Sequence, residues 1–289
     1  MSGKATYPQR RYTRRDFLRV TAAATACGRL FTACGDPNLA GKIRVTPSTV
    51  RADEPFTITL KDLSPWQRVT LRARFVDAYD VEWRSRAVFR ADIQGTVDVS
   101  RQPPVEGSYT GTDPMGLVWS AYGSGTSYAI SLRPQPLFVT AETGGETAHV
   151  EVSRTLLTDE IASTNVRERG LYGRFFRPAT GGPVPGVLVI VGSDGGLAPY
   201  AMREATLLAS HGFAALALAY FYVGSLPYRL ARIPLEYFGD AIRWLQVHPS
   251  VRGDRLGVIG TSRGGELALL LGAHYPDLEA VVSYVGSGL

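Results

Sequence analysis

The sequence predicts two domains: an all-β sandwich, followed by a domain in which strands of a parallel sheet alternate with helices. Short runs of alternating apolar and polar residues fill the first half of the chain. Continuous apolar runs separated by helix-like stretches fill the second half, and the change falls near Arg167. The 289 residues, 45% of them apolar, are enough for two ordinary domains.

The basic residues are concentrated at the N-terminus. The formal net charge is +5, but residues 1–34 hold seven Lys and Arg against one Asp, which leaves the rest of the chain close to neutral. We therefore expect no nucleic-acid partner. Both cysteines, Cys27 and Cys34, lie in the same N-terminal segment, so residues 35–289 offer no disulfide framework and no cysteine metal site. No apolar run reaches the roughly 18 residues of a membrane-spanning helix.

Residues 1–34 resemble a bacterial twin-arginine export signal. Arg14 and Arg15 carry the twin-arginine pattern, and an Ala/Thr-rich apolar stretch follows them. Residues Leu30–Cys34 resemble a lipoprotein cleavage box in which Cys34 is the acylated residue. We expect export to the periplasm or the extracellular space, with membrane attachment through Cys34. The alternative is a basic N-terminus that no export machinery recognises.

Residues 42–158 are predicted to form the β-sandwich. Period-two alternation places one face of each strand on a core and the other in water, and strands at this spacing are typical of a sandwich. The alternating runs are Phe56–Leu60, Val69–Phe75, Ala87–Ala91 and His149–Val152. Turn residues such as Gly144 and Gly145 separate them. No catalytic set gathers in this region, so we expect a structural module.

Residues 167–289 are predicted to form a doubly wound α/β sheet. Continuous apolar runs indicate strands that are covered on both faces, and their alternation with helices is typical of this architecture. The predicted strands are Val187–Val191, Ala214–Ala219, Leu256–Ile259 and Leu278–Val285. The predicted helices are Tyr200–Ser210, Leu235–Leu245 and Glu266–Ala273, the second of them carrying one apolar stripe.

The segment Gly260-Thr261-Ser262-Arg263-Gly264 fits the pattern G-x-S-x-G. A predicted strand enters it and a predicted helix leaves it, which is the context of the nucleophile elbow in α/β hydrolases. Gly260 and Gly264 are needed because side chains there would collide across so sharp a turn. We therefore expect Ser262 to be a nucleophile. The alternative is an ordinary glycine-rich turn.

A second glycine-rich segment, Gly192–Gly196, follows the strand that ends at Val191. Hydrolases of this fold place an oxyanion donor on the corresponding loop, and the second donor is the N–H of the residue after the nucleophile. The expected donors are therefore the backbone N–H groups of Ser193 and Arg263. The alternative is a phosphate-binding loop, but the glycines do not fit G-x-G-x-x-G and no Lys follows as a P-loop requires.

Both segments together resemble the acyl-CoA thioesterases and the bile acid-CoA:amino acid N-acyltransferases. The resemblance runs from about Val45 to Leu289. The segments that carry it are Met115–Ser120, Gly195–Leu197, His211–Ala214, Leu218–Phe221, Leu235–Phe238, His248–Pro249, Gly260–Gly265 and Val285–Ser287. It implies an immunoglobulin-like β-sandwich followed by a C-terminally incomplete α/β-hydrolase domain, acting on the thioester of fatty acyl-CoA.

The resemblance leaves the acceptor and the substrate open. Acyl transfer to an amino acid is associated in this family with a Cys nucleophile, so Ser262 favours water as the acceptor. Acyl-CoA is a cytosolic metabolite, whereas the leader indicates export, so another thioester, an ester or a lactone stays an alternative. No metal or organic cofactor is implied.

A serine nucleophile needs a base and an acid that orients it, which in this fold follow the nucleophile along the chain. His274 stands twelve residues after Ser262, which on a helix separates them by about 18 Å. His211 and His248 are placed at helix ends, where a cation suits the helix dipole, and His149 falls in the sandwich. We therefore expect the triad acid and His to lie beyond Leu289, and the 289 residues alone to be inactive.

The sequence thus predicts a serine thioesterase or esterase that forms an acyl-Ser262 intermediate with a small-molecule acyl thioester or ester. Two alternatives stand beside this prediction. One is an acyl-CoA:amino acid N-acyltransferase. The other is a non-catalytic surface lipoprotein that uses a degenerate hydrolase scaffold for binding.

Overall fold

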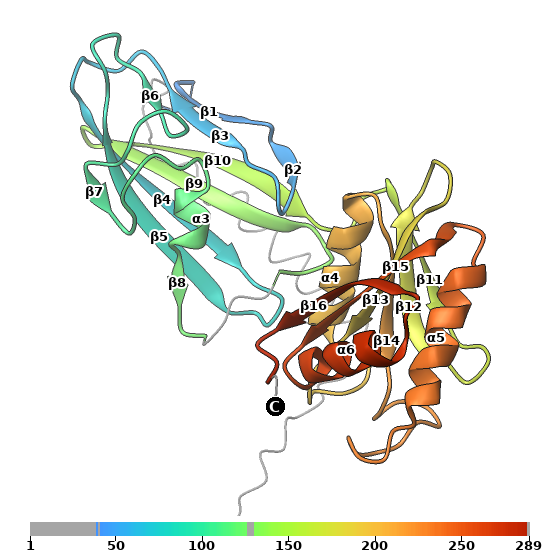
Figure 1. Ribbon diagram of the computed structural model, residues 1–289. Helices are drawn as coiled ribbons and strands as arrows, with labels where there is room; N and C mark the ends of the chain where they lie inside the picture. The colour runs from blue at the N-terminus through green and yellow to red at the C-terminus, as the bar shows by residue number, and fades with distance from the viewer. Residues whose placement is uncertain (1–38, 40, 126–129, 288–289) are drawn as a thin grey trace, which may run out of the picture.

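The computed structural model describes residues 39, 41–125 and 130–287. The export and lipidation predictions for residues 1–34, including Cys34, lie outside the described residues. Figure 1 shows two bodies, a β-rich one that comes first in the chain and a mixed sheet flanked by helices that follows it. Each has its own apolar core among the described residues. The predicted fold class, all-β followed by α/β, is confirmed.

The first body consists of two sheets that face each other. A three-stranded sheet has the order β1-β3-β6, and the larger sheet has the order β2-β10-β9-β4-β5-β7, with β8 also paired to β5. The bounds are β1 Ile43–Thr46, β2 Thr49–Arg51, β3 Thr57–Leu60, β4 Arg68–Val76, β5 Glu82–Arg90, β6 Val97–Asp98, β7 Glu106–Gly107, β8 Tyr122–Gly123, β9 Gln135–Thr143 and β10 Glu146–Thr155. One helical turn, α3, spans Gly116–Trp119.

Alternation along the long strands produces the core of this sandwich. In β4 the burial pattern strictly alternates, with Leu71 and Phe75 inside and Arg72 and Arg74 outside. The inward residues of β4 and β9 pack with Ile58 and the other inward residues of the small sheet. Period-two patterning is therefore what commits these strands to opposite faces of one core.

The second body is built on a six-stranded sheet with the order β11-β12-β14-β13-β15-β16. Its strands are β11 Ile161–Val166, β12 Tyr172–Pro178, β13 Val184–Ile190, β14 Ala214–Ala219, β15 Val251–Thr261 and β16 Leu278–Tyr284. The helices are α4 Pro199–Ser210, α5 Leu235–Val247 and α6 Arg263–His274. Every residue of β14 is buried, which explains its continuous apolar sequence.

The four strands that the sequence predicts do form a parallel, doubly wound sheet, and two further strands that it does not predict, β11 and β12, make the whole sheet mixed. Pairing is antiparallel between β11 and β12 and between β12 and β14, whereas β14, β13, β15 and β16 pair in parallel. The sheet also begins at Ile161, before the change of pattern near Arg167. Sequence patterning does not predict β11 because it is an edge strand with only its two end residues buried.

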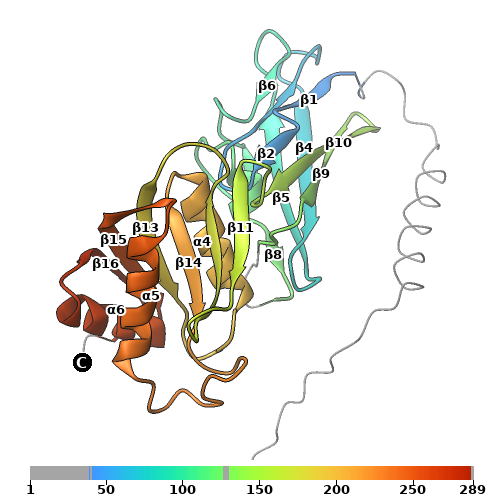
Figure 2. The same ribbon diagram turned by 90° about the vertical axis from the view of Figure 1, so that its right-hand side faces the viewer.

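Strand order and crossover handedness place the helices. From β13 the chain moves in one direction to β14, then reverses to β15 and continues to β16. Right-handed crossovers therefore place α4 on one face of the sheet and α5 and α6 on the other, as Figure 2 shows. The reversal beside β13 brings the loops after β13 and β15 together at one sheet edge, which is where ligands bind in open α/β sheets.

Candidate active site

Ser262 occupies a sharp turn between β15 and α6. Its backbone has φ 57° and ψ −123°, a strained conformation for a residue with a side chain. A Cβ added to Gly260 would lie 1.9 Å from the Gly264 carbonyl oxygen, and one added to Gly264 would lie 2.5 Å from the Val191 oxygen. The prediction that side chains at these two glycines would collide is thus confirmed. Ser262 itself is exposed, so its hydroxyl is accessible.

Backbone hydrogen bonds hold this turn from both sides. The Ser262 N–H donates to the Tyr284 carbonyl oxygen at 2.8 Å, which ties the turn to the end of β16. The N–H groups of Gly265 and Glu266 donate to the Ser262 carbonyl oxygen at 2.8 and 3.2 Å and begin α6. The strained conformation is therefore held by its neighbours on strand and helix.

Gly192 brings the loop after β13 against Ser262. Ile190, two residues earlier, is in register with Gly260 of β15. A Cβ built on Gly192 would lie 3.0 Å from Ser262 Cβ, 3.1 Å from the Thr261 oxygen and 3.4 Å from Ser262 Oγ. This close approach leaves too little space for a side chain at position 192 without a shift of its neighbours. The two glycine-rich segments singled out in the sequence thus meet at one point.

Two tyrosines, which sequence reasoning missed, hold the backbone at this point. The Gly192 N–H donates to the Tyr200 hydroxyl oxygen at 2.9 Å. The Tyr220 hydroxyl donates to the Val191 carbonyl oxygen at 2.6 Å. Burial raises the pKa of both Tyr200 and Tyr220, so both hydroxyls stay protonated at neutral pH. Tyr200 was signalled only by its position in the first turn of the helix after the loop. Tyr220 directly follows a buried strand and lies in the Leu218–Phe221 segment that carries the family resemblance.

The expected oxyanion donors lie on either side of this junction. Ser193 directly follows Gly192 and is exposed, and Arg263 directly follows Ser262 at the start of α6. Within the described residues, neither backbone N–H donates a hydrogen bond to another backbone group. The Arg263 side chain is occupied elsewhere, with Nη1 donating to Glu266 Oε2 at 2.7 Å. The oxyanion role of both N–H groups stays a prediction.

The four histidines have other surroundings. His149 lies 3.0 Å from the Thr140 hydroxyl in the sandwich, and His211 Nε2 lies 2.7 Å from Asp53 Oδ2. His274 is the last residue of α6. In the part of the chain that the structure describes, none of the four hydrogen-bonds to Ser262.

His248 requires a correction, because it does not serve as a cation at a helix end. Its ring packs against Phe175 and Trp244 in tilted geometry, with centroid separations of 4.4 and 4.9 Å. Its Nδ1 accepts the Ser250 N–H at 3.1 Å. Burial, reinforced by the charge of Arg177, lowers the pKa of His248, so the neutral imidazole is favoured.

The described residues contain no cluster of three or more His, Cys, Asp or Glu side chains arranged to hold a metal ion. Nor is any described helix long and apolar enough to cross a membrane. What the described site does present is an exposed serine on a strained turn with glycine backbone packed against it.

The strand order with an antiparallel second strand, together with a serine at a strained strand-to-helix turn, defines an α/β hydrolase. Two family models match the chain. The acyl-CoA thioester hydrolase/BAAT N-terminal region matches residues 53–168, and the BAAT/acyl-CoA thioester hydrolase C-terminal region matches residues 233–289. Together they cover more than half of the sequence. The chain therefore belongs to the acyl-CoA thioester hydrolase/BAAT family.

Curated relatives agree with this assignment. Acyl-coenzyme A thioesterase 1 of Rattus norvegicus is 36% identical over 245 residues, which are 81% of this chain and 58% of the relative. The mitochondrial acyl-coenzyme A thioesterase 2 of Rattus norvegicus is 35% identical over 81% of this chain and 53% of the relative. A peroxisomal succinyl-coenzyme A thioesterase of Mus musculus is 34% identical over 81% of this chain and 58% of the relative. The chain spans little more than half the length of these relatives.

A solved dienelactone hydrolase from Anabaena variabilis is 25% identical and covers 44% of this chain and 64% of its own, with a TM-score of 0.37.

Proposed function

We propose that this protein is a serine thioesterase in which Ser262 is the nucleophile. Ser262 Oγ attacks the carbonyl carbon of an acyl thioester or ester, and the carbon–sulfur or carbon–oxygen bond to the leaving group breaks. The leaving group departs as the free thiol or alcohol, carrying the proton that the Ser262 hydroxyl loses. Water then hydrolyses the acyl-Ser262 ester, which releases the carboxylic acid and restores the hydroxyl. The observation that carries the proposal is the exposed Ser262 at φ 57° with the Gly192 backbone packed against it.

In this proposal the backbone N–H groups of Ser193 and Arg263 donate to the oxyanion that forms during attack. Both residues adjoin the contact between Gly192 and Ser262, and the N–H of Arg263 lies at the N-terminus of α6, where the helix dipole favours negative charge. The two tyrosine hydroxyls hold Val191 and Gly192 and so keep the Ser193 N–H in place before substrate arrives. Preorganised donors of this kind contribute about 10²–10³-fold to turnover.

The substrate class comes from the relatives. Those named above are acyl-CoA and succinyl-CoA thioesterases, which supports a small-molecule acyl-CoA-like thioester as the substrate of this protein. Ser262 as the nucleophile favours water over an amino acid as the acyl acceptor. A transferase or a non-catalytic binding protein is then an outcome that the following test distinguishes.

The test combines covalent labelling with turnover in the full-length protein. Incubation with a fluorophosphonate probe should give an adduct that mass spectrometry maps to Ser262, and Ser262→Ala should remove it. Turnover of acyl-CoA should fall by about 10⁶-fold in the same variant. Ser193→Ala keeps its backbone N–H and should leave labelling intact, which makes it the matched control.

Labelling that persists in Ser262→Ala would overturn the assignment. Formation of an acyl-glycine product when glycine is added to the assay would identify a transferase instead. Correctly folded protein with neither labelling nor turnover would favour the binding protein.

For localisation we propose export through the twin-arginine leader, followed by acylation at Cys34 and membrane attachment. The support is the pattern of residues 1–34 alone: the Arg14-Arg15 pair, the Ala/Thr-rich stretch and the cleavage box that ends at Cys34. Single acyl chains bind membranes only marginally, so stable attachment needs more than one chain at Cys34.

A further inference from the structure

Six arginines share the outer face of the larger sandwich sheet, the face that points away from the apolar core. Directly opposed residues of antiparallel strands lie on one face of a sheet, and β4 and β5 place arginine opposite arginine in three rows. The rows are Arg68 with Arg90, Arg72 with Arg86, and Arg74 with Arg84, and these six residues define the arginine face. Like charges directly opposite each other destabilise a sheet. An anion that lies against the face would remove this repulsion.

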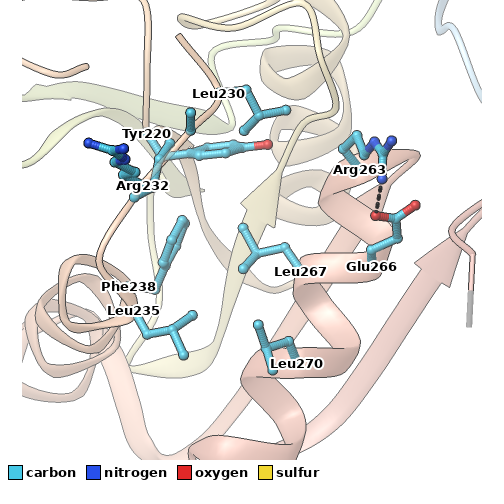
Figure 3. A pocket seen from close by; sticks show the side chains of 11 residues that line it. Tyr220, Leu230, Arg232, Leu235, Phe238, Arg263, Glu266, Leu267 and Leu270 are labelled. Atoms are coloured by element: carbon cyan, nitrogen blue, oxygen red, sulfur yellow. Dashed lines mark hydrogen bonds and ion pairs between the residues drawn. The ribbon is translucent and has the colours of Figure 1, made fainter. Parts of the chain in front are cut away.

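Glutamates on the same face do not balance the arginines. The ion pairs are Glu82 with Arg74 and Arg84, Glu106 with Arg68 and Arg86, and Glu142 with Arg72. A fourth glutamate, Glu151, lies on the face opposite Phe138. Six arginines against four glutamates leave a net charge of +2. On α6, by contrast, the exposed Arg263 has Glu266 as its own partner, as Figure 3 shows.

Aromatic and aliphatic side chains are exposed among the arginines. Tyr122 of β8 lies opposite Arg84, and Phe138 of β9 lies opposite Arg74. One row across the sheet therefore consists of two arginines with an aromatic residue at each end. Tyr122 is 69% exposed and Phe138 39%, and Val76, the next outward residue of β4 after Arg74, is 40% exposed. Cations beside aromatic rings are typical of surfaces that lie at the boundary between water and lipid headgroups.

The geometry of Phe138 favours a bilayer over a single-stranded nucleic acid. The guanidinium of Arg74 lies over the Phe138 ring, 5.1 Å from its centroid. Bases of single strands bind by stacking on open aromatic faces, and Arg74 already covers a face of this ring. The row from Tyr122 to Phe138 crosses three strand spacings, which is about 14 Å. A bilayer presents phosphates over an area at least this wide and needs no ring stacking.

We propose that the arginine face, together with Tyr122 and Phe138, binds the surface of an anionic phospholipid bilayer. The arginines contact the lipid phosphates, and the two aromatic side chains enter the headgroup boundary. Contact with the phosphates offsets the repulsion between opposed arginines that the free face carries. The inference concerns the sandwich alone and depends neither on Ser262 as a nucleophile nor on Cys34 as a lipid anchor.

The test uses the full chain in a background that removes the contribution of residues 1–34 to membrane binding. In this background Gln replaces the seven Lys and Arg of residues 1–34, and Cys34→Ala prevents acylation. Sedimentation measures partitioning onto vesicles of phosphatidylcholine alone and of an equal mixture of phosphatidylcholine and phosphatidylglycerol. Partitioning onto the anionic vesicles should be at least about 10-fold higher, and this excess should fall as salt rises from about 0.05 to about 0.5 M.

Arg84→Gln and Arg86→Gln together remove the excess charge of the face. Each glutamate that they contact keeps a second arginine as its partner. The double variant should lower partitioning onto the anionic vesicles by about 10- to 30-fold. Because two opposed arginine pairs are relieved, the midpoint of thermal unfolding should stay the same or rise. Phe138→Thr should lower partitioning by about fivefold at both salt concentrations, since salt does not screen an apolar contact.

The matched control is the pair Arg243→Gln and Arg255→Gln, which removes the same charge from exposed positions of the hydrolase domain. This control should leave partitioning unchanged. Equal partitioning onto the two kinds of vesicle, or equal losses in the control and in the Arg84 and Arg86 double variant, would overturn the inference.

Two further outcomes would assign the face to another ligand and so also overturn the inference. Displacement of the protein from the anionic vesicles by oligothymidylate at the same phosphate concentration would identify a single-stranded nucleic acid. Loss of acyl-CoA turnover in the Arg84 and Arg86 double variant, measured without vesicles, would place the face in the substrate site. We expect neither, because these two arginines lie on the sandwich and outside the proposed catalytic machinery.

Discussion

Gly192 shows how closely the proposed chemistry depends on single atoms. Its position against Ser262 leaves 3.0 Å between an added Cβ and Ser262 Cβ, a distance that real Cβ atoms rarely reach. A methyl group there must displace the nucleophile or the loop by a few tenths of an ångström. In the proposed mechanism, the N–H groups of Ser193 and Arg263 would then no longer point at the position of the oxyanion.

We therefore predict that Gly192→Ala lowers kcat by about 10- to 100-fold, with a smaller change in KM. The measurement is steady-state turnover of an acyl-CoA substrate by the full-length protein. The matched control is Gly182→Ala, since a Cβ at Gly182 meets nothing within 4 Å and its backbone does not need the left-handed region. Unchanged kcat in Gly192→Ala, with Ser262 still labelled, would mean that the contact with Gly192 does not position the site.

At the scale of the elements, the residue after the end of α5 is His248, whose ring packs among aromatic side chains. The His248 ring packs against Phe175 of β12 and Trp244 of α5, and its Nδ1 accepts the Ser250 N–H in the turn that leads into β15. Protonation would remove the lone pair that accepts this bond and would charge a partly buried ring. The position therefore couples the packing of α5 on the sheet to pH.

The sign of this coupling follows from the lowered pKa of His248. In the unfolded chain a His titrates near about 6.5, so below that pH the unfolded state binds a proton that the folded state resists. Stability contributed by the neutral ring is fully present above about pH 6.5 and is lost as pH falls through the lowered folded-state value. We predict that the free energy of unfolding falls over this window, and that His248→Gln flattens the fall.

Denaturant unfolding at several pH values between about 7 and 5 measures this effect. The exposed His274, which ends α6, supplies the control variant His274→Gln. Equal slopes for wild type and His248→Gln would show that the ring is not responsible.

At the scale of the whole molecule, the sandwich contacts the hydrolase domain at the C-terminal end of α4, and its Tyr79 is near enough to Tyr200, in the first turn of the helix, to help raise the pKa of Tyr200. Arg51 donates to the Ser210 carbonyl oxygen at 3.2 Å, and Asp53 meets His211. Tyr200, which holds Gly192, lies in the first turn of the same helix, and the twelve residues of α4 extend about 18 Å. The contact at Ser210 and His211 is therefore distant from Ser262, and the structural role of the sandwich stays a prediction.

Export and membrane attachment of the protein are tested by substitutions within residues 1–34. We predict that replacing Arg14 and Arg15 by Lys retains the precursor in the cytoplasm, because the pair is the feature that the export machinery recognises. Cys34→Ala should separately release the exported protein from the membrane fraction. Cell fractionation with immunoblotting measures both. Identical distribution of wild type and both variants would show that residues 1–34 carry no export signal.

Local patterns in the sequence determined much of this protein. Alternation predicted long strands such as β4, and apolar runs predicted the buried strands β13 and β14. The glycine spacing around Ser262 predicted a turn with no space for side chains at Gly260 and Gly264. Each of these depends on residues that are neighbours along the chain. Periodicity and glycine geometry are local properties, so one sequence is enough to read them.

The tertiary structure alone decided what depends on distant residues. The antiparallel pairing of β12 with β14 joins segments about forty residues apart, and the edge strand β11 has too few buried residues to show a pattern. Tyr200 and Tyr220 hold Val191 and Gly192 because the crossover from β13 through α4 to β14 returns the chain to the same edge of the sheet. The open space between α5 and α6, shown in Figure 3, likewise exists because the reversal at β13 places both helices on one face. Such contacts arise from packing, and packing is set by the whole fold rather than by any local run of residues.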